Sequence, residues 1–105
     1  MTPDDAAPLA CTLEAGSLEE RAGEWRAFVA SSVASVEPSA ASVRLVLAES
    51  ESALVAAAEL GQREKRCCAF FDVSIELGGD TRTLVLTVPD GAEEALATFV
   101  ALLRS

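Results

Sequence analysis

The clearest structural signal in this chain is FDVSIELGGDTRTLVLTV, residues 71–88. Apolar and polar residues alternate on both sides of its Gly-Gly-Asp centre, which is the pattern of two half-buried strands. Glycine and aspartate suit the positive backbone angles of a tight hairpin turn. The segment therefore predicts a β-hairpin with one buried and one solvent-exposed face. The residues expected on the buried face are Phe71, Val73, Ile75, Leu77, Leu84, Leu86 and Val88.

Two shorter segments upstream alternate in the same way and predict two more strands. Residues 9–13 form the first, which Gly16 ends, and residues 42–47 form the second, with Arg44 on its outer side. The residues expected on the inner sides of these two strands are Leu9, Cys11, Leu13, Val43, Leu45 and Leu47.

Three segments carry apolar residues at intervals of three and four, the spacing of an amphipathic helix. The first helix is expected over residues 18–36, between a capping box at Ser17 and a stop at Pro38. The second runs from a cap at Ser50 or Ser52 towards the paired cysteines, with Gly61 interrupting it at modest cost. The third follows a cap formed by Asp90 and Glu93. The apolar residues that set these intervals are Leu18, Ala22, Trp25, Val29, Val33, Val36, Leu54, Ala57, Ala58, Leu60, Leu96, Phe99, Val100 and Leu103.

The expected order is β-α-β-α-β-β-α, in one domain over residues 9–105 after a flexible tail at residues 1–8. Half of the 105 residues are apolar, which suffices for one hydrophobic core. The fold class is α/β (α+β), a two-layer sandwich in which three helices cover one face of a four-stranded mixed sheet. Right-handed crossovers would make the first three strands parallel.

The charge of the chain, −9 from 17 acidic and 8 basic residues, disfavours nucleic acid and anionic membranes as partners. No apolar segment approaches the roughly 20 residues that cross a bilayer. The first residues, Met1 to Asp5, carry acids where a secretory signal would carry lysine or arginine, so the expected location is cytoplasmic.

Histidine and tyrosine are absent from the sequence, and cysteine occurs three times. The absence of histidine excludes a Ser-His-Asp or Cys-His catalytic group within the chain, and any zinc site with histidine ligands. An odd number of cysteines fits no closed disulfide framework. Neither a G-x-G-x-x-G segment nor a P-loop is present, so no cofactor-binding residues are expected.

The three cysteines are expected to meet at one end of the sheet. Cys11 lies near the start of the first predicted strand, and Cys67 and Cys68 lie just before the third. Parallel strands begin at the same edge of a sheet, which would bring the three sulfurs together. Glu64 lies one helical turn before the pair and on the same side of the helix, where it places a carboxylate on an otherwise apolar stripe.

Three thiolates suit a soft ion in trigonal geometry, such as divalent mercury or trivalent arsenic. Zinc is less suited, because it prefers four ligands and only Glu64 or Asp72 could supply the fourth. The favoured hypothesis is therefore a binding module for a soft metal or metalloid ion, with Cys11, Cys67, Cys68 and Glu64 at the metal site.

Three alternatives stay open beside metal binding. Free cysteines are among the most buried residues, so these could simply fill space in the core or in a homodimer that binds a partner. The chain could instead be a thiol enzyme, redox-active or cleaving a carbon–metal bond, with Glu64 or Asp72 as proton donor.

Arg63, Lys65 and Arg66 would lower the pKa of the neighbouring thiols, whereas the C-terminal end of a helix would raise it.

The segments Cys11-Thr12-Leu13 and Glu64-Lys65-Arg66-Cys67-Cys68-Ala69-Phe70 carry a C-T-L and an E-x-x-C-C-x-F motif. With the tryptophan-bearing helix between them, they resemble a small, largely uncharacterised bacterial domain that occurs alone or joined to MerR-type regulators. The resemblance spans nearly the whole chain after the tail. It implies an effector-binding or metal-sensing role for Cys11, Cys67 and Cys68, with Glu64 beside them, and no direct contact with DNA, since the winged-helix part of such regulators has no counterpart here.

Overall fold

The structure, a computed structural model, describes the backbone of residues 15–67 and 71–104 and the side chains of residues 20–66 and 71–104. Three helices and four strands follow one another in the order α-β-β-α-β-β-α. Their bounds are α1 Ala15–Ser32, β1 Val33–Pro38, β2 Ser42–Leu47, α2 Glu51–Cys67, β3 Asp72–Gly78, β4 Thr81–Thr87 and α3 Glu93–Arg104.

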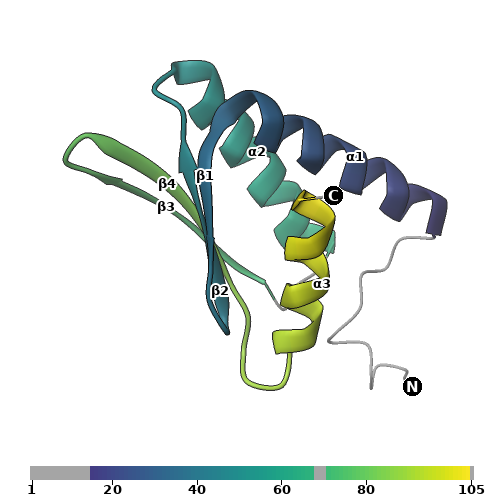
Figure 1. The fold of residues 1–105 in the computed structure, drawn as a ribbon. Coiled ribbons are helices and arrows are strands. Elements are labelled where there is room, and N and C mark those ends of the chain that lie inside the picture. The colour runs from purple at the N-terminus through teal and green to yellow at the C-terminus, as the bar shows by residue number, and fades with distance from the viewer. Residues whose placement is uncertain (1–14, 68–70, 105) are drawn as a thin grey trace.

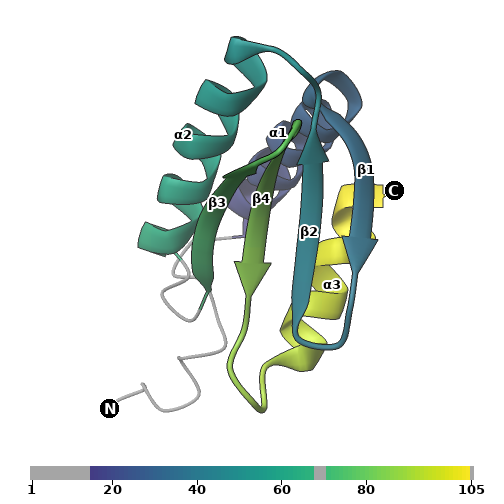
Figure 2. The same ribbon diagram turned by 90° about the vertical axis from the view of Figure 1, so that its left-hand side faces the viewer.

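The four strands form one sheet in the order β1-β2-β4-β3, and the three helices cover one face of it (Figures 1 and 2). The α+β two-layer sandwich predicted from the sequence is confirmed. The prediction of a mixed sheet is wrong for the described strands, because every neighbouring pair is antiparallel. β2 and β3 do run in the same direction, as expected for strands joined by a helix, but β4 lies between them.

The first helix ends earlier than predicted, because residues 33–36 belong to strand β1. Val33 and Val36 are three residues apart, which imitates helical spacing. In the structure they pair with Leu47 and Leu45 on the same side of β2, since the register shifts between Val33 and Ser35. Such an irregularity inserts an extra residue and so keeps both valines on the core side of the sheet. The strand predicted over residues 9–13 lies outside the described residues.

The hairpin predicted over residues 71–88 is confirmed. β3 and β4 pair from Asp72 opposite Thr87 to Gly78 opposite Thr81, which leaves a two-residue turn. Gly79 in that turn has a φ of 58°, an angle that glycine adopts without strain. Leu77 was expected in the core and is 65% exposed, because the tip of the hairpin extends beyond the helical layer (Figure 1).

The core lies between the sheet and the helices. Leu45 of β2 and Leu84 of β4 are fully buried, and Trp25 of α1 is 1% exposed, which confirms its predicted role as an anchor. The indole packs edge-on against Phe28 and Phe99, with ring centroids 5.8 and 5.2 Å away. Edge-to-face contacts of this kind favour a defined arrangement of rings.

Gly61 allows α2 to lie close against the sheet. A Cβ atom at this position would lie 2.8 Å from Cγ1 of Val73 and 3.5 Å from Cδ1 of Leu84. The glycine therefore serves close packing, which its sequence context did not reveal. At the other end of the helix, the hydroxyl of Ser50 accepts a hydrogen bond of 3.1 Å from the amide of Ala53, so Ser50 is the cap. Of the helices in the described part of the chain, none combines the length and apolar character that crossing a membrane requires.

Candidate functional site

Glu64 is the one predicted site residue whose side chain the structure describes. Cys67 is the last residue of α2, and its side chain is not described. Cys11 and Cys68 lie outside the described residues, so the predicted meeting of the three sulfurs does too. The candidate site is therefore built outward from Glu64, which lies one helical turn before Cys67.

The carboxylate of Glu64 is buried between α1 and α2. The residue is 3% exposed, although carboxylates are almost never buried unless they are paired. Its Oε2 atom forms an ion pair with the guanidinium of Arg21, and its Oε1 atom accepts a hydrogen bond of 3.0 Å from Nε1 of Trp25. Both oxygens thus have donors from α1. We call Arg21, Trp25 and Glu64 the buried clamp.

The buried clamp fixes the C-terminal part of α2 against α1. Arg21 is itself only 8% exposed, so a cation and an anion are removed from water together. Replacing such a pair by apolar residues is often neutral or stabilising, which makes it weak evidence for stability as its purpose. The pair lies one helical turn before Cys67, the last residue of α2.

Arg21 and Trp25 were not linked to Glu64 by the sequence. A signal was present, since Arg21 stands four residues before Trp25 and so lies on the same, buried face of α1. A charged residue on that face requires a buried partner, and Glu64 was the carboxylate already noted on an apolar stripe of α2. The pairing of the two helices, which brings these residues together, has no sequence signature.

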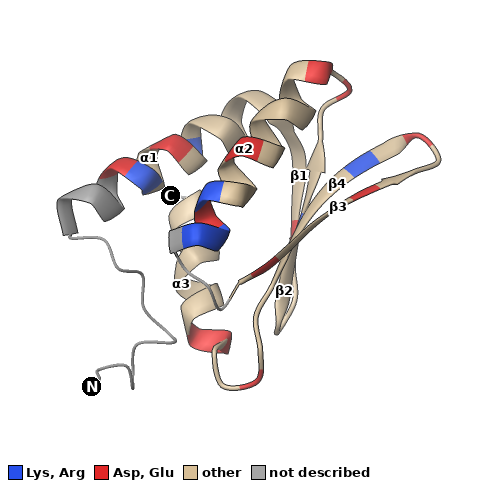
Figure 3. Ribbon diagram, turned by 180° about the vertical axis from the view of Figure 1, so that it is seen from behind, with Lys and Arg blue, Asp and Glu red and all other residues tan. Residues whose placement is uncertain are grey.

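The last turns of α2 carry basic residues (Figure 3), two of which contact neighbouring elements. Arg63 forms an ion pair with Glu24 of α1, on the partly exposed side of the same helix pair. The ammonium of Lys65 donates a hydrogen bond of 2.8 Å to the carbonyl of Phe71 and lies 3.6 Å from a carboxylate oxygen of Asp72. Arg66 is exposed. The positive charge predicted beside Cys67 is therefore present, and two of the three cations are held in place.

Asp72, considered from sequence as a fourth zinc ligand or a proton donor, begins β3. Its side chain is 88% exposed and forms an ion pair with Lys65. Within residues 15–67 and 71–104, no three residues of the types His, Cys, Asp or Glu form a group that could hold a metal ion.

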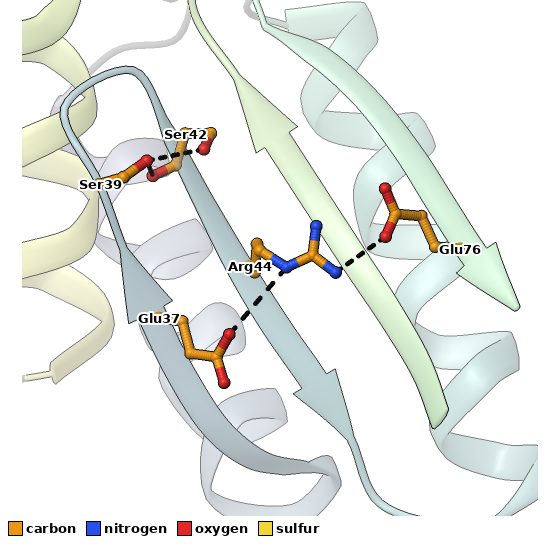
Figure 4. A network of polar contacts seen from close by, with 5 residues as sticks. All are labelled: Glu37, Ser39, Ser42, Arg44 and Glu76. Atoms are coloured by element: carbon orange, nitrogen blue, oxygen red, sulfur yellow. Dashed lines mark hydrogen bonds and ion pairs between the residues drawn. The ribbon is translucent and has the colours of Figure 1, made fainter. Parts of the chain in front are cut away.

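A second polar network lies on the sheet face that the helices leave open (Figure 4). The guanidinium of Arg44 donates to Glu76 at 2.8 Å and lies 4.0 Å from Glu37. The hydrogen bond to Glu76 and its charge raise the pKa of Arg44 above the usual value. All three residues are partly exposed, and their role is to tie β1, β2 and β3 together across β4.

The first turn of α2 and the β3–β4 turn border an open, polar groove. Glu49, Glu51, Asp80 and Arg82 line it together with the exposed Leu77. Glu51 opens α2, so the groove lies about 20 Å along the helix from the buried clamp and belongs to a different part of the molecule.

Comparison of the chain with protein-family models, with curated proteins and with solved structures finds no match.

Proposed function

We propose that this protein captures a soft metal or metalloid ion, mercuric ion or arsenite, through the thiolates of Cys11, Cys67 and Cys68. The observation that carries the proposal is the burial of Glu64 between Arg21 and Trp25, one turn before Cys67. A charged clamp inside the core at this point anchors the end of α2, whose last residue is Cys67. The resemblance to the domain with the E-x-x-C-C-x-F motif points to the same residues.

Glu64 acts in this proposal by holding α2 in place, because both of its carboxylate oxygens already accept hydrogen bonds from α1. The groups that orient a site contribute to metal affinity without contacting the metal. α1 begins at Ala15, four residues after Cys11, and four residues of chain span at most about 14 Å. Cys11 is thus tethered to the same helix that the buried clamp attaches to α2.

The chemistry needs three thiols that lose their protons. Mercuric ion would form three Hg–S bonds and release three protons. Arsenite would exchange its three hydroxyl groups for three sulfurs and release three waters. Zinc fits less well, since a fourth ligand would have to come from outside the buried clamp. Reduced thiols require a reducing compartment, for which we propose the cytoplasm.

Titration of the reduced protein with mercuric ion tests the proposal. We expect one equivalent per chain to remove all three thiols from reaction with a thiol reagent, and to quench the fluorescence of Trp25, the one tryptophan of the chain. The variant Cys11→Ser should weaken the capture of arsenite by at least about a hundredfold, because one of three As–S bonds is lost. Thr12→Ser, an adjacent change of similar size, serves as the matched control. Unchanged capture in Cys11→Ser would refute three-thiol binding.

The alternatives predict other outcomes in the same sample. For a thiol enzyme, one cysteine should react with iodoacetamide well below the ordinary thiol pKa of about 8.5. For space-filling cysteines, in a monomer or a homodimer, all three should react slowly in the native protein and no ion should be retained. In that case replacing all three by alanine or serine would lower stability and leave partner binding intact.

A further inference from the structure

Lys65 links the last turn of α2 to the first residue before β3. Its ammonium donates a hydrogen bond of 2.8 Å to the carbonyl of Phe71, and Lys65 and Phe71 stand on either side of Cys67 in the chain. Hydrogen bonds with a charged donor are roughly twice as strong as neutral ones. This bond connects the end of α2 with the residue that precedes β3.

The carbonyl that Lys65 holds belongs to a fixed part of the molecule. Phe71 is 2% exposed, and its ring packs against Phe99 of α3 with centroids 5.3 Å apart. The side chain of Lys65 is about half exposed, so the bond lies at the surface on one side and against the core on the other. Asp72 adds a weaker ionic contact at 3.6 Å. The stem of Lys65 therefore fixes the end of α2 relative to the core.

We propose that Lys65 is a positioning residue for soft-ion capture, acting through its bond to the carbonyl of Phe71. The inference rests on the proposed function of the thiols. Ligand groups that are held in place before binding need less ordering when the ion arrives, and this raises affinity. The buried clamp fixes α2 before Cys67, and the bond from Lys65 ties α2 to Phe71, which follows Cys67 in the chain. The structure thus holds the backbone of Cys67 from both directions.

The experiment compares variants in their competition with a small dithiol for mercuric ion. Lys65→Met should retain mercuric ion about tenfold more weakly than the unchanged protein, equivalent to about 1.4 kcal/mol. Lys65→Arg keeps a charged donor of similar length and should restore affinity to within about twofold of the original. Arg66→Met removes the same charge one residue nearer to Cys67 and should also stay within about twofold, because it leaves the bond to Phe71 intact.

Each other outcome counts against the inference. Equal affinity in Lys65→Met and the unchanged protein overturns it, and so does a failure of Lys65→Arg to restore binding. An equal loss in Arg66→Met would show that charge alone matters. If the unchanged protein captures no mercuric ion, the proposed function itself fails. If it captures the ion and Lys65→Met captures it equally well, only the positioning role of Lys65 fails. Far-UV circular dichroism checks that Lys65→Met folds, and Lys65→Gln replaces it if it does not.

Discussion

The pairing of Glu64 with Arg21 makes a sharp prediction about stability. The change Glu64→Gln removes the negative charge from the buried clamp while keeping nearly the same shape. The amide oxygen of glutamine can still accept the hydrogen bond from Trp25. The change therefore isolates one term, the carboxylate that compensates a guanidinium only 8% exposed.

The expected loss is about 3–5 kcal/mol, the usual cost of removing one partner from a buried ion pair. A domain of this size has about 5–15 kcal/mol of stability in total, so the change would remove a large part of it. Arg21→Met should cost a similar amount for the converse reason. The double change Arg21→Met with Glu64→Gln should cost less than either single change, since no buried charge remains.

The assay is urea unfolding followed by circular dichroism, with the free energy extrapolated to water. Glu24→Gln is the matched control, because Glu24 joins the same two helices through an ion pair with Arg63 that is partly exposed. Exposed pairs contribute about 0–1 kcal/mol. A loss for Glu64→Gln as small as that of the control would refute the reasoning that the carboxylate is a buried counter-charge.

Two other substitutions test the packing and the capping of α2 by the same urea assay. Gly61→Ala should lower the unfolding free energy by about 1–2 kcal/mol, because the clash with Val73 outweighs a gain of about 1 kcal/mol in helix propensity; a more stable variant would contradict the close packing of α2 on the sheet. Ser50→Ala should cost about 1 kcal/mol through loss of the cap on the amide of Ala53, and Ser52→Ala, which leaves that bond in place, should cost less.

How far the sequence predicted the fold depended on how local each signal is. The hairpin over residues 71–88 followed from alternation and turn residues that lie within one segment. β1 was missed because Val33 and Val36 face the core through an irregularity whose cause is pairing with β2. A register shift depends on the partner strand, so neither spacing nor propensity within β1 could reveal it. The sheet is antiparallel, not mixed, because β4 lies between β2 and β3. Strand order, like register, depends on which strands pair in the folded protein.

The sequence predicted one residue of the candidate site but not the contacts that this residue makes. Glu64 stood out from sequence as a carboxylate on an apolar stripe, and the structure confirms that it is buried. Its partners could not be named, because they belong to another helix and come near only when α1 and α2 pack. Lys65 was read as one of several cations at a helix end. Its bond to Phe71 depends on where the chain turns after α2, which tertiary packing determines.

The open face of the sheet bears on whether the chain needs a partner to cover it. β4 is a central strand, and its outward residues Thr83 and Val85 are only 3% and 8% exposed although the described helices lie on the other face of the sheet. Arg44 lies opposite Val85 and reaches across β4 to Glu76, so its aliphatic stem covers the apolar part of this face. A second copy docking here would have to displace the network of Arg44, Glu37 and Glu76 and bring like carboxylates together. The network of Arg44 therefore makes this face of the sheet unfavourable for docking of a second copy.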